Sequence, residues 1–222
     1  MRPDAVLFDC DGVLVDSEPV TDKVIIANLA RYGIAVSAAE VTEYFLGGTL
    51  AGVGEKARAQ GADLPEDWVD EIYAETFDAL RLGTPLIKGV PDLLDRLDAL
   101  GIPFGVGSNG PRAKMKITLG QNGLWERCKD TMVSAHDGVP AKPAPDIYLK
   151  LASLLGADPA RCVVVDDSPS GAKGGLAAGC KVIAYAERTP EALLAPLGVP
   201  IARTMSEVAA MMGVSDDQDG TV

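Results

Sequence analysis

Short apolar runs that alternate with helical patterns constrain the fold of this chain more than any other feature. Runs that are apolar throughout are typical of strands buried on both faces of a parallel sheet. The runs are Ala5 to Phe8, Phe104 to Gly107, Thr131 to Ser134, Cys162 to Val165 and Lys181 to Ala184. Helical patterns between most of them predict an α/β protein with a doubly wound, mainly parallel sheet.

Proline near the start and glycine just past the end mark several of these helices, as expected from the preferences of helix termini. The patterns run from Pro91 to Gly101, from Asp146 to Gly156 and from Ser168 to Gly179. A helix is therefore expected in each of these connections between strands.

The segment from about Ser17 to Leu82 breaks the alternation. It carries helical patterns, including a capping box from Ser37 to Glu40, and no convincing strand. This pattern predicts an all-helical domain inserted into the α/β core. The expected parts are a core of residues 1–16 and 84–213, a helical cap of residues 17–83, and a polar, acidic tail of residues 214–222 that we expect to be disordered.

Charge and composition exclude several classes of partner. The formal net charge of −12 argues against nucleic acids and anionic membranes. No apolar stretch approaches the ~20 residues that span a bilayer. The four cysteines form no Cys-x-x-Cys pair, which favours unpaired thiols in a reducing compartment. We expect a cytoplasmic protein, monomeric by default, whose partner is a small molecule.

Two pairs of acidic residues follow predicted strands. Asp9 and Asp11 come directly after the first strand, and Asp166 and Asp167 follow the fourth. Buried carboxylates this close repel each other, and a divalent cation or a division into one anion and one acid relieves that cost. Mg²⁺ prefers oxygen ligands of this kind. The alternatives are a polar turn at the first pair and a helix cap at the second.

Ser108, Asn109 and Lys142 supply complementary groups. Ser108 and Asn109 follow the second predicted strand, where a hydroxyl, an amide and backbone N–H groups suit a phosphate oxygen. Lys142 lies in a proline-rich loop that would fix its ammonium as a point charge for a phosphoryl group. A plain turn and a solvated lysine are the alternatives. Because parallel strands end at one edge of a sheet, we expect these groups to meet the acids in one crevice.

The motifs, in this order, resemble the haloacid-dehalogenase superfamily of phosphatases and phosphomutases over nearly the whole chain. The segment from Asp9 to Glu18 is similar to the first motif of that family, and Ser108, Lys142 and the pair Asp166–Asp167 match the later ones. The resemblance implies a Rossmann-like core with a helical cap of the subgroup that contains β-phosphoglucomutase. Within it, the stretch that begins at Ser108 looks like that of bacterial 6-phosphogluconate phosphatases.

The resemblance implies a Mg²⁺-dependent phosphatase that hydrolyses a small phosphorylated metabolite. Asp9 would attack phosphorus and form an aspartyl phosphate, and Asp11 would protonate the leaving alkoxide and then accept a proton from water. The implied substrate is a sugar phosphate or sugar-acid phosphate, with 6-phosphogluconate as one candidate. The implied Mg²⁺ ligands are the Asp9 carboxylate, the Asp11 backbone carbonyl, Asp167 and, directly or through water, Asp166. The implied phosphate-binding residues are Ser108, Asn109 and Lys142.

The loop from Phe45 to Leu50 is the part of the cap expected nearest this site. Gly48 and Thr49 are the expected substrate contacts, because glycine permits close backbone approach and Thr49 offers a hydroxyl. An ordinary helix connector is the alternative. His136, the single histidine of the chain, is expected to be a solvated loop residue.

A phosphosugar mutase is the second enzyme hypothesis. β-Phosphoglucomutase has an arginine after the corresponding glycine-containing segment and a cap histidine near the position of Thr21, whereas this chain has Leu50 and Thr21. Both differences favour the phosphatase. A non-catalytic binding protein is the third hypothesis, but it would lack a nucleophile or a metal-binding acid, and neither is missing here.

Overall fold

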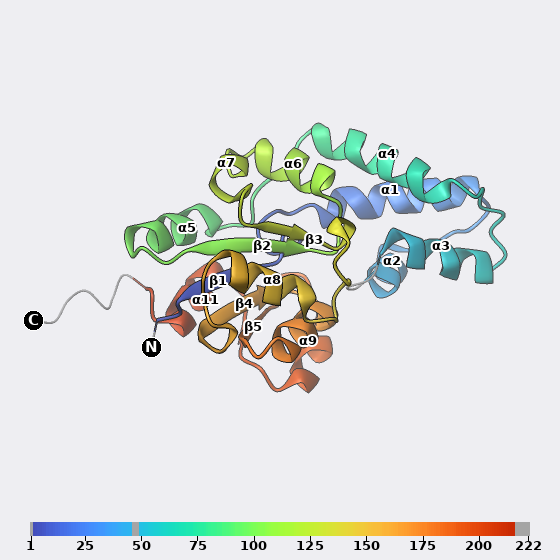
Figure 1. The fold of residues 1–222 in the computed structure, drawn as a ribbon. Helices are drawn as coiled ribbons and strands as arrows, with labels where there is room; N and C mark the ends of the chain where they lie inside the picture. Colours follow the sequence, from blue (N-terminus) through green and yellow to red (C-terminus); the bar gives the residue numbers. More distant parts are fainter. Residues whose placement is uncertain (1, 46–48, 216–222) are drawn as a thin grey trace, which may run out of the picture.

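The chain folds around a parallel six-stranded sheet in the order β3-β2-β1-β4-β5-β6 (Figure 1). This computed structural model describes residues 2–45 and 49–215. The strands are β1 (Ala5–Phe8), β2 (Phe104–Ser108), β3 (Met132–Ser134), β4 (Cys162–Asp166), β5 (Lys181–Tyr185) and β6 (Ile201–Ala202). The predicted strands are confirmed to within a residue at each end. The edge strand β6 was not predicted, because two residues carry too little pattern.

Helices cover both faces of the sheet, which confirms the predicted doubly wound α/β class. One face packs against α5 (Val90–Ala99), α6 (Arg112–Gly120), α7 (Trp125–Cys128) and α11 (Met205–Met212). The other packs against α8 (Asp146–Leu154) and α9 (Pro169–Ala177). Successive side chains of a strand point to opposite faces. Val6 and Phe8 accordingly join the first layer, and Ala5 and Leu7 join the second.

Local signals explain where the helices begin and end. The Ser168 hydroxyl accepts a hydrogen bond from the Gly171 N–H at the start of α9, and Thr204 does the same for α11. The predicted helices after Pro91, Asp146 and Ser168 all form. The remaining short elements are α10 (Glu191–Leu194) and the 3₁₀ turns η1 (Ala135–Asp137), η2 (Pro159–Arg161) and η3 (Ala195–Leu197).

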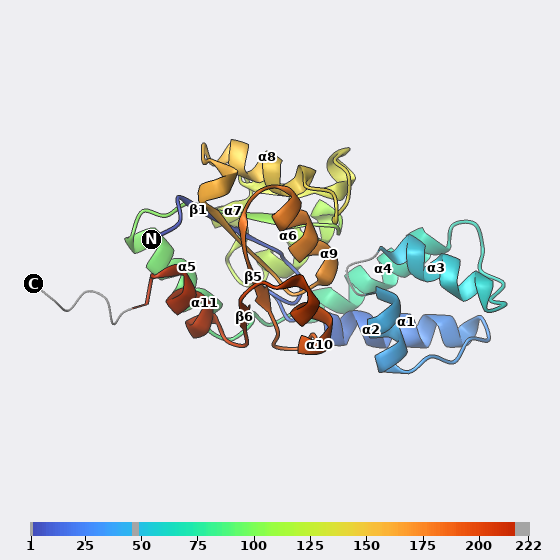
Figure 2. The same ribbon diagram turned by 90° about the horizontal axis from the view of Figure 1, so that it is seen from below.

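The segment between β1 and α5 forms helices and no strand among its described residues. The helices are α1 (Glu18–Arg31), α2 (Ala38–Phe45), α3 (Leu50–Ala59) and α4 (Trp68–Arg81). They bury a core of their own around Trp68, whose indole N–H donates to Asn28 Oδ1 at 2.7 Å. The predicted capping box forms, since Ser37 and Glu40 exchange hydrogen bonds. Figure 2 shows these helices grouped beyond one end of the sheet; we call them the cap.

The chain returns from the cap to the core beside the end of α6. Gln121 accepts from the Thr84 N–H at 3.0 Å and donates to the Leu80 carbonyl at 2.8 Å, while Asn122 donates to the Thr84 carbonyl at 2.7 Å. These bonds tie the end of the cap to a fixed helix.

The expected tail differs from the structure at its first residue. Val214 is fully buried in the core, and its carbonyl accepts from Arg96 Nε at 3.2 Å. Residues 216–222 of that tail lie outside the described residues. Among the described residues, no helix is long and apolar enough to cross a membrane. The four cysteines are free and buried.

Candidate active site

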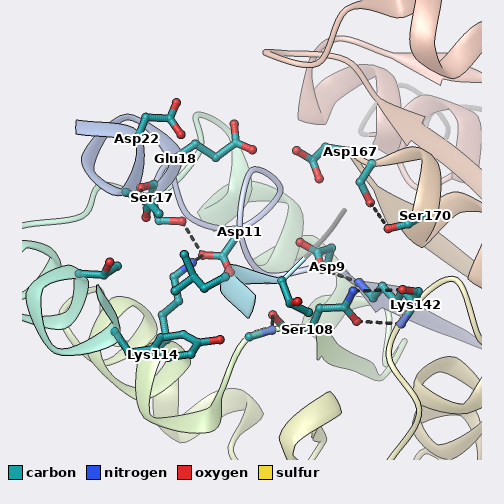
Figure 3. A pocket seen from close by; sticks show the side chains of 18 residues that line it. Asp9, Asp11, Ser17, Glu18, Asp22, Ser108, Lys114, Lys142, Asp167 and Ser170 are labelled. Carbon is teal, nitrogen blue, oxygen red and sulfur yellow. Dashed lines mark hydrogen bonds and ion pairs between the residues drawn. The ribbon is translucent and has the colours of Figure 1, made fainter. Parts of the chain in front are cut away.

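The carboxyl ends of four strands bring the predicted residues together. Asp9 follows β1, Ser108 ends β2, Lys142 lies on the loop after β3, and Asp167 follows β4. Together with Asp11 and Asn109, these side chains line one cavity, which is closed on its other side by α1, α4 and the start of α3 (Figure 3). The site lies where β1 separates the two halves of the sheet, the usual ligand position in open α/β folds.

Lys142 is the centre of a buried ion-pair group. Its side chain is 2% exposed, and its ammonium lies 2.5 Å from Asp9 Oδ1 and 2.8 Å from Asp166 Oδ2. Removal from water opposes its charge, but the two carboxylates hold the pKa of Lys142 well above its ordinary value. Burial raises the pKa of Asp9 to about 7, against the opposing charge of Lys142. The lysine is therefore a fixed cation beside the Asp9 carboxylate.

Asp166 lies behind Lys142 rather than in the cavity lining. Its Oδ2 accepts from Lys142 and from the Tyr148 hydroxyl, at 2.8 and 2.5 Å. Its Oδ1 accepts from the Ser168 N–H and hydroxyl, at 2.9 and 2.8 Å. With both oxygens engaged by protein donors, Asp166 orients Lys142. The sequence placed it with the expected metal ligands, whereas the structure does not bring it to the cavity surface.

Asn109 is bonded to the backbone of the Lys142 loop. Its side-chain oxygen accepts from the Lys142 N–H at 2.8 Å, and its amide group donates to the Lys142 carbonyl at 3.3 Å. Ser108 is 2% exposed, and its hydroxyl oxygen accepts from the Gly110 N–H at 2.9 Å. The Ser108 O–H group lies in the cavity wall, so it can donate to an anion there. Asn109 thus fixes the position of the lysine from the neighbouring strand end.

Asp11 has a partner that the sequence patterns did not single out. Lys114, on the first turns of α6, is 7% exposed, and its ammonium lies 2.8 Å from Asp11 Oδ1. Ser17 donates a hydrogen bond to the same oxygen. The position of Lys114 near the start of the helix that follows Ser108 was the available signal. The pair fixes the Asp11 carboxylate at the junction of core and cap.

Asp167 is a buried carboxylate that makes no hydrogen bond or ion pair within residues 2–45 and 49–215. It is 7% exposed, and burial together with the nearby charge of Glu18 raises its pKa well above the ordinary value. Gly12, with φ +76°, allows this approach, because a Cβ there would lie 2.3 Å from Asp167 Oδ2. The carboxylate therefore packs against the backbone next to Asp11, where a cation would relieve its burial.

The oxygen atoms that the protein offers at this cavity are of the kind that binds Mg²⁺. Asp9 and Asp167 supply carboxylates at one cavity, which Asp11 also lines. Asp167 packs against Gly12, the residue that follows Asp11. In the described part of the chain, no group of three or more His, Cys, Asp or Glu side chains is placed to hold a metal ion by itself. Mg²⁺ needs no such group, since it is usually bound through one or two carboxylates, water and substrate phosphate.

The cap contributes more residues than its expected loop. Thr49 lines the cavity and caps α3, with its hydroxyl accepting from the Gly52 N–H at 3.3 Å. Gly48 lies outside the described residues. Other cap residues that the sequence did not assign to the site also line it, among them Glu18, Thr21 and Asp22 on α1 and Tyr73 and Thr76 on α4. Glu18, the last residue of the first motif, and Asp22, one helical turn later, were the available signal.

His136 makes a contact that spans core and cap. Its ring lies edge-on to that of Tyr73, with centroids 6.0 Å apart, and its Nε2 is 3.5 Å from the Tyr73 hydroxyl. His136 is exposed, as expected of a solvated loop residue, although it also contacts Tyr73 on α4. It does not line the cavity.

We expect Lys114→Met to lower kcat by about tenfold, a fraction of the 10²–10⁴ that a positioned acid or base contributes. The physical reason is that Asp11 keeps Ser17 but loses the cation that fixes its carboxylate. Lys114→Arg, which retains the charge, is the matched control and should recover part of the loss. The rate of the reaction at this site, measured across a range of pH, provides the readout. An unchanged kcat and pH profile in the methionine variant would remove Lys114 from the site.

Comparison with known proteins extends these observations. The family model of the haloacid dehalogenase-like hydrolases matches residues 3–179. Hexitol phosphatase A of Escherichia coli is 35% identical over 189 residues, which are 83% of this chain and 83% of that protein. The 6-phosphogluconate phosphatase of Escherichia coli is 29% identical over 185 residues, again 83% of each.

A solved structure and a longer relative complete the comparison. The crystal structure of a haloacid dehalogenase family hydrolase from Deinococcus radiodurans, with bound phosphate and sodium, superposes with a TM-score of 0.79 and 34% identity, covering 97% of this chain and 98% of that one. The chain spans 47% of the bifunctional riboflavin kinase/FMN phosphatase of Arabidopsis thaliana, to which it is 31% identical.

Proposed function

Because this chain belongs to the haloacid dehalogenase-like hydrolase family, we propose that it is a Mg²⁺-dependent phosphatase that forms an aspartyl phosphate on Asp9. The observation that carries the proposal is the buried Asp9 carboxylate, held against Lys142 in the cavity that Asp167 also lines. The named relatives with similar length are phosphatases, which supports phosphate monoesters as the substrate class.

The proposed reaction has two steps, and Asp11 transfers a proton in each of them. An Asp9 oxygen attacks phosphorus, and the bond between phosphorus and the leaving oxygen breaks as Asp11 gives that oxygen a proton. Asp11 then takes a proton from a water molecule, whose oxygen attacks the phosphorus of the aspartyl phosphate and releases phosphate with regeneration of Asp9. Lys114 and Ser17 hold Asp11 in place for both transfers.

The remaining residues hold charge while the bonds change. Lys142 and the Ser108 hydroxyl face the space where the phosphate oxygens would lie, and Asn109 and Asp166 keep Lys142 there. Preorganised donors of this kind stabilise the transition state without reorganising during the reaction. Asp9, Asp167 and the Asp11 carbonyl would hold Mg²⁺, which when bound supplies positive charge against the carboxylates and the phosphate.

The proposed substrate is a sugar phosphate or sugar-acid phosphate, with 6-phosphogluconate among the candidates. The test is phosphate release from a panel of phosphorylated sugars, sugar acids and polyols in the presence of Mg²⁺, with p-nitrophenyl phosphate as a simple aryl ester. Phosphate release from at least one ester supports the proposal. Formation of a phosphosugar isomer that depends on a bisphosphate would instead support a mutase. No turnover of any ester would contradict both.

We expect removal of Mg²⁺ with a chelator to abolish phosphate release, and re-addition to restore it. A cation held by Asp9 and Asp167 would bind the folded chain and not the unfolded one, so Mg²⁺ at 100 times its dissociation constant would stabilise the fold by about 2.7 kcal/mol. For a domain of this size that corresponds to a rise in melting temperature of about 5 to 10 °C. Differential scanning calorimetry with and without Mg²⁺ measures it.

Asp167→Asn separates this site from nonspecific cation binding. The variant should lose most of the Mg²⁺-dependent rise in melting temperature, since it removes one of the two carboxylates. Asp92→Asn, an exposed acid on α5, removes the same charge elsewhere and should keep the rise. Equal shifts in the two variants would place the cation away from Asp167.

A further inference from the structure

The half of the cavity formed by the cap differs chemically from the half formed by the strand ends. Glu18, Thr21 and Asp22 from α1 and Tyr73 and Thr76 from α4 line it. Figure 3 shows Glu18 and Asp22 on α1, on the side of the cavity away from Lys142, and no dashed line reaches either carboxylate. Any leaving group attached to a phosphate at Asp9 would lie against these residues.

Thr76 carries a buried hydroxyl that lacks a partner. Its side chain is 1% exposed, and its Oγ1 makes no hydrogen bond within the described part of the chain. Threonines in helices commonly donate to the carbonyl four residues earlier. Thr21 does so, to the Ser17 carbonyl at 3.0 Å, and Thr118 donates to Lys114 at 3.2 Å. Thr76 therefore keeps its hydroxyl available to a group inside the cavity, and buried polar groups are normally paired.

The cap half holds two carboxyl groups that form no ion pair with a described cation. Within the described residues that line the cavity, the only lysines are Lys114 and Lys142, and each is already paired with an aspartate. Glu18 and Asp22 make no hydrogen bond or ion pair with a described residue. Burial, followed by the charge of Asp22, raises the pKa of Glu18 to about 7. Arg188 lies outside the cavity lining and pairs with Asp16 at 2.8 Å. Its charge and that of Lys114 oppose the rise in the pKa of Glu18 and Asp22, but burial outweighs them.

We propose that the cap half of this cavity selects an uncharged, polyhydroxylated leaving group, such as an open-chain polyol, over one that carries a second acidic group. The inference rests on the proposed phosphatase function and narrows its candidate substrates, because it ranks sugar-acid phosphates such as 6-phosphogluconate below uncharged polyol phosphates. Hydroxyl groups can donate to the Glu18 and Asp22 oxygens and pair with Thr76. A carboxylate or second phosphate would lose water beside two acids, and both lysines of the described cavity lining are already paired with aspartates.

A matched pair of substrates tests the proposal. Glucitol 6-phosphate and 6-phosphogluconate differ at one carbon, which is a hydroxymethyl group in the first and a carboxylate in the second. We expect kcat/KM for glucitol 6-phosphate to exceed that for 6-phosphogluconate by about tenfold or more, because two like charges at short range in a partly buried site cost at least that factor. An equal or reversed ratio overturns the proposal.

Variants of the cap wall locate the selectivity. The double variant Glu18→Gln, Asp22→Asn should bring the ratio toward one by raising kcat/KM for 6-phosphogluconate. Asp70→Asn, an exposed acid on α4, removes charge outside the cavity and should keep the ratio. Thr76→Val should lower kcat/KM for glucitol 6-phosphate by several-fold, with p-nitrophenyl phosphate turnover changed less, because that ester offers no hydroxyl. A ratio unchanged in the double variant also overturns the proposal.

Turnover of p-nitrophenyl phosphate distinguishes failure of the proposed phosphatase function from failure of the proposed polyol selectivity. Turnover of p-nitrophenyl phosphate together with a ratio of one or less leaves the phosphatase in place and refutes the polyol selectivity. Absence of phosphate release from all three esters, by a chain that circular dichroism shows to be folded and with Mg²⁺ present, refutes the proposed function and the selectivity with it.

Discussion

Replacement of Asp9 by asparagine is expected to reduce phosphate release by at least about 10⁴-fold, the scale on which loss of a covalent nucleophile acts. Asparagine keeps the volume of the side chain, but its amide lacks the anionic oxygen that attacks phosphorus. Stopped assays at saturating substrate measure the loss. Residual activity of a tenth or more of the wild-type value would mean that another group attacks phosphorus.

The fold should tolerate this change. Asp9 is buried near Asp166 and Asp11, whose charges raise its pKa together with burial. Asparagine removes that repulsion, and Lys142 retains Asp166 as its partner at 2.8 Å. We therefore expect a melting temperature equal to or above that of the wild type when Mg²⁺ is absent. Asp92→Asn, which removes an exposed acid, is the control for activity and should retain full turnover.

Replacement of Lys142 by methionine is expected to impair both activity and stability. Loss of one preorganised donor costs about 10²- to 10³-fold in kcat. The substitution also leaves Asp9 and Asp166 buried without their cation, and breaking a buried pair in this way costs about 3–5 kcal/mol. In a domain of this size that lowers the melting temperature by roughly 10 °C or more. Thermal unfolding followed by circular dichroism measures the fall in melting temperature.

A double variant separates the two effects. Lys142→Met with Asp166→Asn removes one of the uncompensated charges, so part of the lost melting temperature should return while phosphate release stays low. Lys142→Arg, which keeps the charge in a larger side chain, should retain more stability than methionine. If methionine alone leaves the melting temperature unchanged, Lys142 is not the cation that compensates Asp9 and Asp166.

Much of the fold was predictable because its signals are local. The strands ending before Asp9, Ser108 and Asp167 are short apolar runs, and a run of that kind reports burial without knowledge of its neighbours. The helix starts after Ser37 and Ser168 depend on hydrogen bonds within one turn, and both form. The two residues of β6 carry no such signal. The pairing of β6 with β5 depends on the rest of the sheet.

The candidate site was predictable in membership but not in its internal bonds. The parallel topology sends the carboxyl ends of the strands to one edge, so the gathering of Asp9, Ser108 and Lys142 follows from pattern alone. Which atoms then meet does not, because Lys142 and Asp9 are 133 residues apart in the chain. Asp166 was expected to bind the metal directly or through water, and in the structure its oxygens accept from Lys142, Tyr148 and Ser168.

The sequence by itself determined the alternation of strands and helices, the helical insert and the residue types at the strand ends, since hydrophobic period and helix capping act over a few neighbouring residues. Only the tertiary structure decided the pairing of Lys114 with Asp11 and the unpartnered hydroxyl of Thr76. Both features lie at the cavity between the cap helices and the core. The distances between side chains there depend on how the two domains pack, and no local sequence pattern determines them.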